Sequence, residues 1–236
     1  MEDPVSSKIP KWRGIPTTSI KKNELEAKTI TNRLKQKSMS LPRIDDKKRW
    51  AGFPGLAGWA EKIATIIPDF DYYIEPFAGS AKVFQELMTI KHNFSGMVLN
   101  DKSYFVYQWL EKEFGDKVMA VTRKDFIDCI KMWDGSRAFF LLDMPWNKSF
   151  YDQDFSCFDR YSVKEYDEQV LELCHKMEGS FIITTRKENM RMIHSTFNKY
   201  LVKSIYPVSG HYPLLLLTTN LNLDGNKQIL KFKEKK

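Results

Sequence analysis

The sequence predicts an α/β sandwich with a mainly parallel sheet that ends in a late antiparallel hairpin. From about residue 56 onward, short apolar runs of strand length alternate with amphipathic segments of helical period. Such alternation is typical of a parallel sheet covered by helices. Near the C-terminus the strands follow one another directly, and the last two flank Asp224-Gly225-Asn226, a hairpin-type turn.

Periodicity and stop signals define each element. The first helix carries apolar residues at Leu56, Ile63 and neighbouring helical positions and stops at Pro68. Asp125 is placed to cap a helix, and the wholly apolar run 138–142 is typical of a buried strand. The predicted helices span 56–67, 80–89, 103–113, 125–133, 162–177 and 188–199, and the predicted strands span 72–75, 97–99, 117–121, 138–142, 181–185, 202–206, 214–219 and 228–232.

The excess positive charge is confined to the N-terminal part of the chain. Residues 1–49 hold 13 of the 37 basic and 6 of the 30 acidic residues, so the remainder is neutral, although the net charge of all 236 residues is +7. We therefore expect a basic, flexible N-terminal arm over 1–48 and one domain over 49–236. A basic arm on a neutral domain indicates an electrostatic contact with polyphosphate. A solubilising tail or a docking arm for a protein partner remains the alternative.

Composition also argues against several classes of function. No stretch approaches about 18 consecutive apolar residues and the first residues include acids, so we expect neither a membrane span nor a secretory signal. Cys129, Cys157 and Cys174 form no Cys-x-x-Cys pair, which indicates reduced cysteines and no zinc site. No histidine spacing or Gly-x-Ser-x-Gly turn points to metal-dependent or serine-nucleophile chemistry.

One candidate binding motif is Glu75-Pro76-Phe77-Ala78-Gly79-Ser80, which closes the predicted strand 72–75. Its small residues would let a ligand approach the backbone, and the helix that follows would offer free amides. The motif has no Gly-Lys-Ser/Thr, so it is not a triphosphate loop, and its single glycine is too few for the dinucleotide fingerprint. An ordinary tight turn remains the alternative.

Acids also follow the next two predicted strands. Asp101 comes after 97–99, where an acid in a doubly wound fold commonly binds ribose hydroxyls. Asp125 follows 117–121, and it could accept a hydrogen bond from an adenine amine while Phe126 packs beside the base. Capping of the next helix explains Asp101 equally well, and Asp125, taken alone, is better explained by capping than by contact with a base.

The most informative motif is Asp143-Met144-Pro145-Trp146, which follows the buried strand 138–142. In open α/β sheets, ligands bind just beyond the carboxyl ends of the strands. A carboxylate there can accept a hydrogen bond from a substrate amine, and a flat ring nearby can stack on a flat substrate. Packing gives no evident reason for this combination, so the motif favours an enzyme that holds a nucleobase amine.

In this order, the motifs resemble those of the Dam-like class of DNA adenine-N6 methyltransferases, which use S-adenosylmethionine. The resemblance covers about residues 49–220 and implies a Rossmann-like methyltransferase sandwich over 49–236. The matching segments are Arg49-Trp50-Ala51-Gly52, similar to the family's Lys-Trp-Ala-Gly motif; 74–81, similar to its cofactor loop; Asp143-Met144-Pro145-Trp146, similar to its catalytic Asp-Pro-Pro-Tyr; and 215–220, similar to its late strand.

The resemblance implies a role for each candidate residue. A flipped adenine would stack on Trp146, while Asp143 and the backbone carbonyl of Met144 accept hydrogen bonds from its exocyclic amine. The residues implied to be catalytic are Asp143, Met144, Pro145 and Trp146, and those implied to bind S-adenosylmethionine are Trp50, Ala51, Gly52, Glu75, Pro76, Phe77, Ala78, Gly79, Ser80, Asp101, Asp125, Phe126 and Asp143. No metal is implied.

The sequence departs from the family pattern in three places. Met144 replaces a proline, and Phe53-Pro54 replaces Gly-Lys, so a lysine near the cofactor is missing. Only 62 residues separate Ser80 from Asp143, where the family inserts a target-recognition domain, so that domain is expected to be minimal or absent. Target reading would then fall to the basic arm, to residues 147–161 or to a partner subunit.

The implied function is site-specific DNA adenine-N6 methylation, the kind found in restriction–modification systems. We expect a cytoplasmic protein that acts at the nucleoid, or in the nucleus of a eukaryotic or viral host, with nucleic acid and not a membrane as partner. One alternative is the same chemistry on RNA, which Trp146 and the missing domain favour. The other is a non-catalytic subunit that binds nucleic acid or a partner enzyme; Met144 and the missing lysine favour it, whereas Glu75, Asp101 and Asp143 argue against it.

Overall fold

A computed structural model describes residues 58–90, 94–144, 163–186, 190–205 and 211–232. All belong to the second of the two units into which the chain divides, Arg49–Lys236, and the predicted arm lies outside them. These residues form an eight-stranded sheet in the order β3-β2-β1-β4-β5-β7-β6-β8. The strands are β1 (Tyr72–Glu75), β2 (Gly96–Asn100), β3 (Ala120–Thr122), β4 (Ala138–Leu142), β5 (Ser180–Arg186), β6 (Asn198–Lys203), β7 (Leu214–Thr219) and β8 (Leu230–Lys231).

The first five strands are parallel, and the chain changes direction across the sheet between β1 and β4. It runs outward from β1 through β2 to β3 and then returns to β4 on the other side of β1. This is the strand order of doubly wound folds, in which ligands bind where the order reverses. β7 lies antiparallel between β5 and β6. The predicted fold class, a Rossmann-like sandwich with late antiparallel strands, is therefore confirmed.

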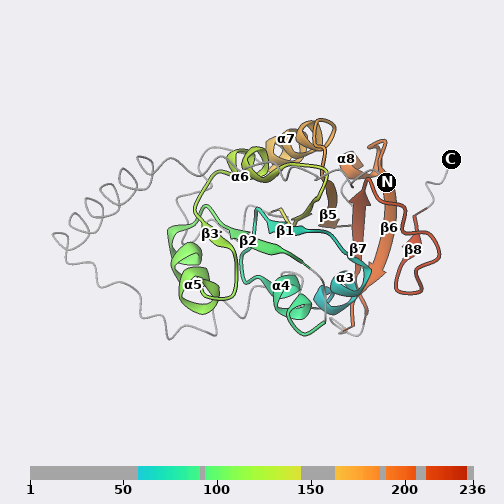
Figure 1. The fold of residues 1–236 in the computed structure, drawn as a ribbon. Coiled ribbons are helices and arrows are strands. Elements are labelled where there is room, and N and C mark those ends of the chain that lie inside the picture. The colour runs from blue at the N-terminus through green and yellow to red at the C-terminus, as the bar shows by residue number, and fades with distance from the viewer. Residues whose placement is uncertain (1–57, 91–93, 145–162, 187–189, 206–210, 233–236) are drawn as a thin grey trace, which may run out of the picture. The chain divides into compact units, whose positions relative to one another are not determined.

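Helices cover both faces of the sheet, with α3, α4 and α5 on one face and α6, α7 and α8 on the other (Figure 1). Their bounds are α3 (Ala60–Ile66), α4 (Lys82–Leu87), α5 (Tyr104–Phe114), α6 (Phe126–Trp133), α7 (Val163–Cys174) and α8 (Met190–Ile193). No helix in the described ranges is long and apolar enough to cross a membrane.

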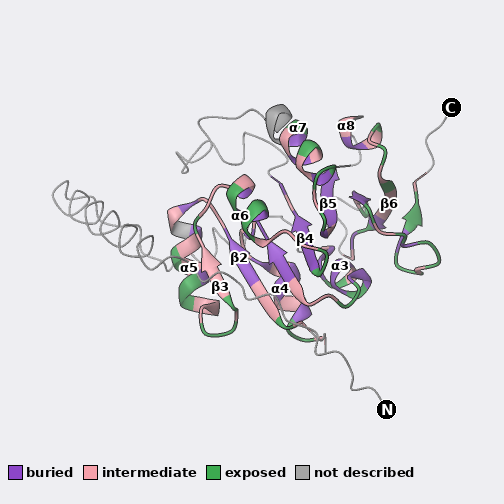
Figure 2. Ribbon diagram, turned by 45° about the horizontal axis from the view of Figure 1, so that its top comes forward, coloured by how far each residue is buried: buried purple, intermediate pink, exposed green. Residues whose placement is uncertain are grey.

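Each face of the sheet has its own hydrophobic core, because successive residues of a strand point to opposite faces. Phe139 and Leu141 pack under α3 and α4, whereas Phe140 and Leu142 pack under α6 and α7. All five residues of β4 are buried, as the apolar run predicts, and the buried strands lie between helices with exposed outer sides (Figure 2). The central strands therefore hold their carboxyl ends on a rigid base.

The predicted hairpin between the last two strands is wrong. β7 already pairs with β5 and β6, so both of its edges are occupied, and β8 pairs with β6 instead. The Tyr200 hydroxyl of β6 holds the connecting loop there, since it accepts from the Leu223 N–H (2.9 Å) and donates to the Asp224 carboxylate (3.2 Å). Gly225 adopts φ +86° in this loop. The consecutive strands that do pair antiparallel near the C-terminus are β6 and β7.

Several further predicted elements differ in extent, among them the strand expected over 202–206, which is β6 and spans Asn198–Lys203. The helix expected over 188–199 is α8, which ends at Ile193, because Asn198 and Lys199 pair with β7 as the start of β6. The strand expected over 117–121 is β3, which begins at Ala120. Lys117 instead forms a turn, its N–H donating to the Phe114 carbonyl (2.8 Å).

Candidate functional site

The candidate site lies where β1 and β4 end beside each other. Tyr72, Tyr73 and Ile74 pair in parallel with Ala138, Phe139 and Phe140, so the last residue of β1, Glu75, stands level with Leu141. Glu75 follows Tyr73 on the face covered by α3 and α4, and Asp143 continues the series of Phe139 and Leu141 on the same face. Two carboxylates predicted from separate motifs therefore share one face at the point where the strand order reverses.

Glu75 is buried and hydrogen-bonded within the protein. Its Oε1 accepts from the Tyr73 hydroxyl (2.5 Å) and from the Phe84 N–H of α4 (3.0 Å). The pKa of Glu75 is raised to about 8, because burial and, to a smaller extent, the charge of Asp143 raise it more than the two hydrogen bonds lower it. The raised pKa keeps Glu75 protonated at neutral pH, and its two hydrogen bonds tie β1 to α4.

Asp143 is held from the opposite side by β5. The Thr184 hydroxyl donates a hydrogen bond of 2.6 Å to its Oδ1, and Thr184 itself is fully buried. The next residue, Met144, is 2% exposed and packs into the core under α6 and α7. The acid and the methionine thus point to opposite faces, so the Met144 side chain anchors the end of β4 while the Asp143 carboxylate stays on the face of Glu75.

The turn after β1 uses several of its amides within the protein. Ala78 N–H donates to the Asn100 carbonyl (2.8 Å), Gly79 N–H to Asp101 Oδ2 (3.0 Å) and Phe84 N–H to Glu75. The expectation of free amides in the helix that follows is therefore wrong for Phe84, the one of these three that lies in α4. Gly79 and Ala81 have φ of +49° and +48°, and no atom of the described residues lies within 4 Å of a Cβ placed on Gly79. The side of the turn at Gly79 is open.

Asp101 connects this turn to α5. Its Oδ2 accepts from Gly79 N–H, and its Oδ1 accepts from Ser103 N–H at 2.9 Å. Burial raises the pKa of Asp101 to about 6, against the lowering effect of these two bonds. Each carboxylate oxygen can accept a second hydrogen bond, so Asp101 can hold the turn and still bind a hydroxyl.

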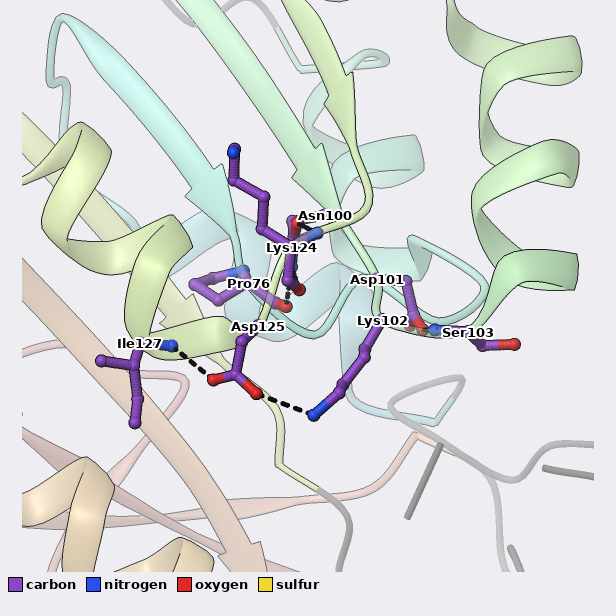
Figure 3. A network of polar contacts seen from close by, with 8 residues as sticks. All are labelled: Pro76, Asn100, Asp101, Lys102, Ser103, Lys124, Asp125 and Ile127. Atoms are coloured by element: carbon purple, nitrogen blue, oxygen red, sulfur yellow. Dashed lines mark hydrogen bonds and ion pairs between the residues drawn. The ribbon is translucent and has the colours of Figure 1, made fainter. Parts of the chain in front are cut away.

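Asn100 organises the site, and sequence reasoning did not assign it this role. Its side-chain amide donates to the carbonyls of Pro76 (2.8 Å) and Lys124 (3.1 Å). Its Oδ1 accepts from the Thr122 hydroxyl (2.7 Å) and the Lys124 N–H (2.8 Å). One buried side chain at the end of β2 therefore joins the segments that follow β1 and β3 (Figure 3). The only sign of this role in the sequence is that Asn100 stands at the end of a strand, next to an acid.

Asp125 caps α6 and pairs with a lysine. Its Oδ1 accepts from the Ile127 N–H (3.1 Å), and its Oδ2 lies 2.8 Å from Lys102 Nζ (Figure 3). The capping interpretation is confirmed. Phe126 stacks on Phe77 with ring centroids 5.0 Å apart, so two aromatic residues of the predicted cofactor set lie in contact beside Asp125.

The structure describes eleven of the predicted site residues and brings them to one edge of the sheet. They are Glu75, Pro76, Phe77, Ala78, Gly79, Ser80, Asp101, Asp125, Phe126, Asp143 and Met144. Trp50, Ala51, Gly52, Pro145 and Trp146 lie outside the described residues. Among the residues that are described, no group of His, Cys, Asp and Glu is placed to hold a metal. Cys129 and Cys174 are buried free thiols, and burial raises the pKa of Cys129 to about 12.

The described residues at this edge offer acceptors for amines and hydroxyls. Asp143, Asp101 and Asp125 follow three different strands of the sheet, β4, β2 and β3. An aromatic pair lies beside Asp125, and the described residues leave open space beside Gly79. Such an arrangement suits a ligand that combines a flat base, sugar hydroxyls and an amine.

No family model and no curated protein matches this chain. Among solved structures it is similar to the Escherichia coli protein yhhF, described as a candidate methyltransferase, with 16% identity over 78% of this chain and 92% of that chain and a TM-score of 0.44. It is also similar to SMU.1697c of Streptococcus mutans, a candidate methyltransferase solved with SAH, with 10% identity over 68% and 94% of the two chains and a TM-score of 0.43.

A third solved structure with this resemblance is spermidine synthase from Thermotoga maritima. Its identity is 10%, over 72% of this chain and 62% of that chain, with a TM-score of 0.47. The likeness to all three concerns the fold. Any assignment of cofactor and substrate depends on the residues at the strand ends.

Proposed function

We propose that this protein transfers a methyl group from S-adenosylmethionine to the exocyclic N6 amine of an adenine in nucleic acid, with DNA as the first substrate to test. The observation that carries the proposal is the position of Asp143. It follows the buried strand β4 beside β1, where the strand order reverses, and its carboxylate is fixed by Thr184. A carboxylate so placed accepts a hydrogen bond from an amine presented at this edge.

The residues at the strand ends fit S-adenosylmethionine, which supplies an electrophilic methyl group when bound. Asp101 would accept hydrogen bonds from the ribose hydroxyls, and Asp125 from the adenine amine of the cofactor. Phe77, which is partly exposed and stacks on the buried Phe126, would provide apolar surface beside that base. The open side of Gly79 allows a ligand to approach the turn 75–80 closely. The donors and acceptors are thus those that a nucleoside with a charged tail requires.

The protein's own groups would then orient the substrate amine. Asp143 and the Met144 carbonyl accept the two N–H groups of the adenine amine, which directs the nitrogen lone pair toward the methyl group. Glu75, whose pKa of about 8 keeps it protonated at pH 7, adds no second negative charge beside Asp143. Trp146, by its resemblance to the family motif, would stack on the flipped base.

The path of the chain supports target recognition outside the sheet domain. Between Ser80 and Asp143 the described residues form α4, β2, α5, β3, α6 and β4 with short connections, so they contain no inserted domain. The basic arm 1–48, residues 147–161 or a partner subunit would read the target. Of the alternatives, methylation of RNA uses the same site. The other alternative is a non-catalytic subunit. It would give the polar contacts of Asp143 no role in catalysis.

The direct test is transfer of a labelled methyl group from S-adenosylmethionine to mixed-sequence DNA and RNA. We expect label in N6-methyladenine, with loss of transfer in Asp143→Ala. Asp116→Asn is a matched control, because Asp116 is an exposed acid in the connection that leads into β3 at the opposite edge of the sheet. This control should keep full activity.

Each other outcome has a defined meaning. Label in RNA alone would support the proposed methylation chemistry and identify RNA, instead of DNA, as the substrate. Absence of transfer from folded protein that binds S-adenosylmethionine in calorimetry would indicate that a partner subunit is required. Absence of both transfer and cofactor binding would overturn the proposal in favour of the non-catalytic subunit.

A further inference from the structure

Thr184 is a buried polar residue of the central strand β5. It lies on β5, follows Ile182 on the face covered by α3 and α4, and is fully buried. The register of β4 and β5 pairs Leu142 with Ile183, which places Thr184 level with Asp143. Its hydroxyl donates to Asp143 Oδ1 at 2.6 Å, although the two residues are 41 positions apart in the sequence.

This contact controls the orientation of the carboxylate. A length of 2.6 Å is typical of a hydrogen bond from a hydroxyl to a charged oxygen, which is about twice as strong as a neutral one. The terminal torsion of an aspartate is broad, so packing around Cβ alone does not fix the plane of the carboxylate. A donor on a rigid central strand removes that freedom and determines which way the carboxylate faces.

The next residue of β5 provides an internal comparison. Thr185 is 2% exposed and points to the opposite face of the sheet, and its hydroxyl has no hydrogen-bond partner among the described residues. The two neighbouring threonines therefore have the same shape and similar burial, but only Thr184 contacts the candidate catalytic acid. The general preference of threonine for β-strands therefore does not by itself explain why the Thr184 hydroxyl contacts Asp143.

We propose that Thr184 is a positioning residue that holds the Asp143 carboxylate in the orientation needed to accept the N–H of the substrate amine. The inference rests on the proposed function, because it assigns Thr184 a part in the same site. Thr184 does not touch the substrate; it acts through Asp143.

The test compares Thr184→Val, which keeps the shape and removes the donor, with Thr184→Ser, which keeps the donor. Since misplacement of a catalytic group by about 1 Å can reduce the rate roughly 100-fold, we expect Thr184→Val to lower kcat about 10- to 100-fold. The KM values for S-adenosylmethionine and for nucleic acid should change little. Thr184→Ser should restore most of kcat, and Thr185→Val should match the wild type.

A spectroscopic measurement separates this inference from the proposed function. In protein labelled with ¹³C aspartate, the carboxyl resonance of Asp143, assigned by its loss in Asp143→Asn, should shift in Thr184→Val but not in Thr184→Ser or Thr185→Val. If the Asp143 resonance shifts but the wild type transfers no methyl group, the contact between Thr184 and Asp143 exists without a catalytic purpose. That result would overturn both the inference and the proposed function. If Thr184→Val does not fold, Thr184→Ala against Thr184→Ser gives the same comparison. An unshifted resonance, or a kcat equal to that of the wild type, would overturn the inference alone.

Discussion

Glu75 ends β1, and Asp143 directly follows the neighbouring parallel strand β4 on the same face of the sheet, where its charge raises the pKa of Glu75. Burial is the larger cause, and together they place this pKa at about 8, against an ordinary value of 4.5. The folded protein therefore retains a proton on Glu75 at a pH where the unfolded chain has released it. This proton links the stability of the domain to the charge state of the site.

Stability should therefore fall as the pH rises toward 8. Between pH 4.5 and about 8 the folded state binds more protons than the unfolded state, so this contribution is complete below pH 4.5 and is lost through pH 8. Asp101 also has a raised pKa, of about 6, so the window from pH 6.5 to 8.5 isolates Glu75. Urea unfolding across that window should show a loss of about 1 to 2 kcal/mol.

Glu75→Gln should remove this slope. The glutamine oxygen can still accept from the Tyr73 hydroxyl and the Phe84 N–H, so the variant should fold. Glu172→Gln, at an exposed position on α7, is the control and should retain the slope. A Glu75→Gln variant with the same pH dependence as the wild type would show that Glu75 is ionised in the folded protein.

Asn100→Asp should destabilise the domain and weaken cofactor binding together. The substitution replaces the two donors to the Pro76 and Lys124 carbonyls with an acceptor, so buried acceptors face a carboxylate. Leaving buried polar groups without partners costs about 1 to 3 kcal/mol, which urea unfolding would measure. Because Asn100 joins three strand ends, calorimetry should show weaker binding of S-adenosylmethionine.

The control is Asn198→Asp, at an exposed asparagine whose amide donates to the Leu221 carbonyl far from the strand ends of the site. It should change stability by less than about 1 kcal/mol, as is usual for surface positions. An Asn100→Asp variant with unchanged cofactor affinity would show that the strand-end segments keep their arrangement without this amide.

The two central strands could be predicted from the sequence, whereas the contacts between strand ends could not. β1 and β4 have the predicted bounds, because each is a short apolar run with clear stop signals, and alternation along them fixes the faces of Glu75 and Asp143. Thr184 reaches Asp143, and Asn100 reaches Pro76 and Lys124, only through the register of the sheet. The pairing of β8 with β6 likewise depends on which edge remains unoccupied, which periodicity does not encode.

Met144→Ala should lower stability more than any change of surface methionine. Met144 is 2% exposed and packs in the core under α6 and α7, so its truncation leaves a cavity. Such substitutions cost about 2 to 5 kcal/mol, which thermal or urea unfolding would detect. Met132→Ala, at a position 38% exposed on α6, should cost far less. Equal losses in the two variants would show that Met144 does not anchor the end of β4.

Asp125→Asn separates the capping role of Asp125 from its proposed role toward the cofactor. Asparagine caps helices as well as aspartate does, so its oxygen can still accept from the Ile127 N–H. The ion pair with Lys102 is partly exposed, and its loss should cost less than about 1 kcal/mol. Stability should therefore remain close to that of the wild type.

Cofactor affinity should respond differently in the same variant. If Asp125 accepts the adenine amine, the new amide places a donor against a donor, and Kd for S-adenosylmethionine should rise about tenfold, equivalent to about 1.4 kcal/mol. Lys102→Gln removes the same ion pair and keeps the carboxylate, so it should bind the cofactor nearly as well as the wild type. Equal weakening by Asp125→Asn and Lys102→Gln would assign the effect to the lost ion pair, and an unchanged Kd in Asp125→Asn would leave Asp125 with its capping role alone.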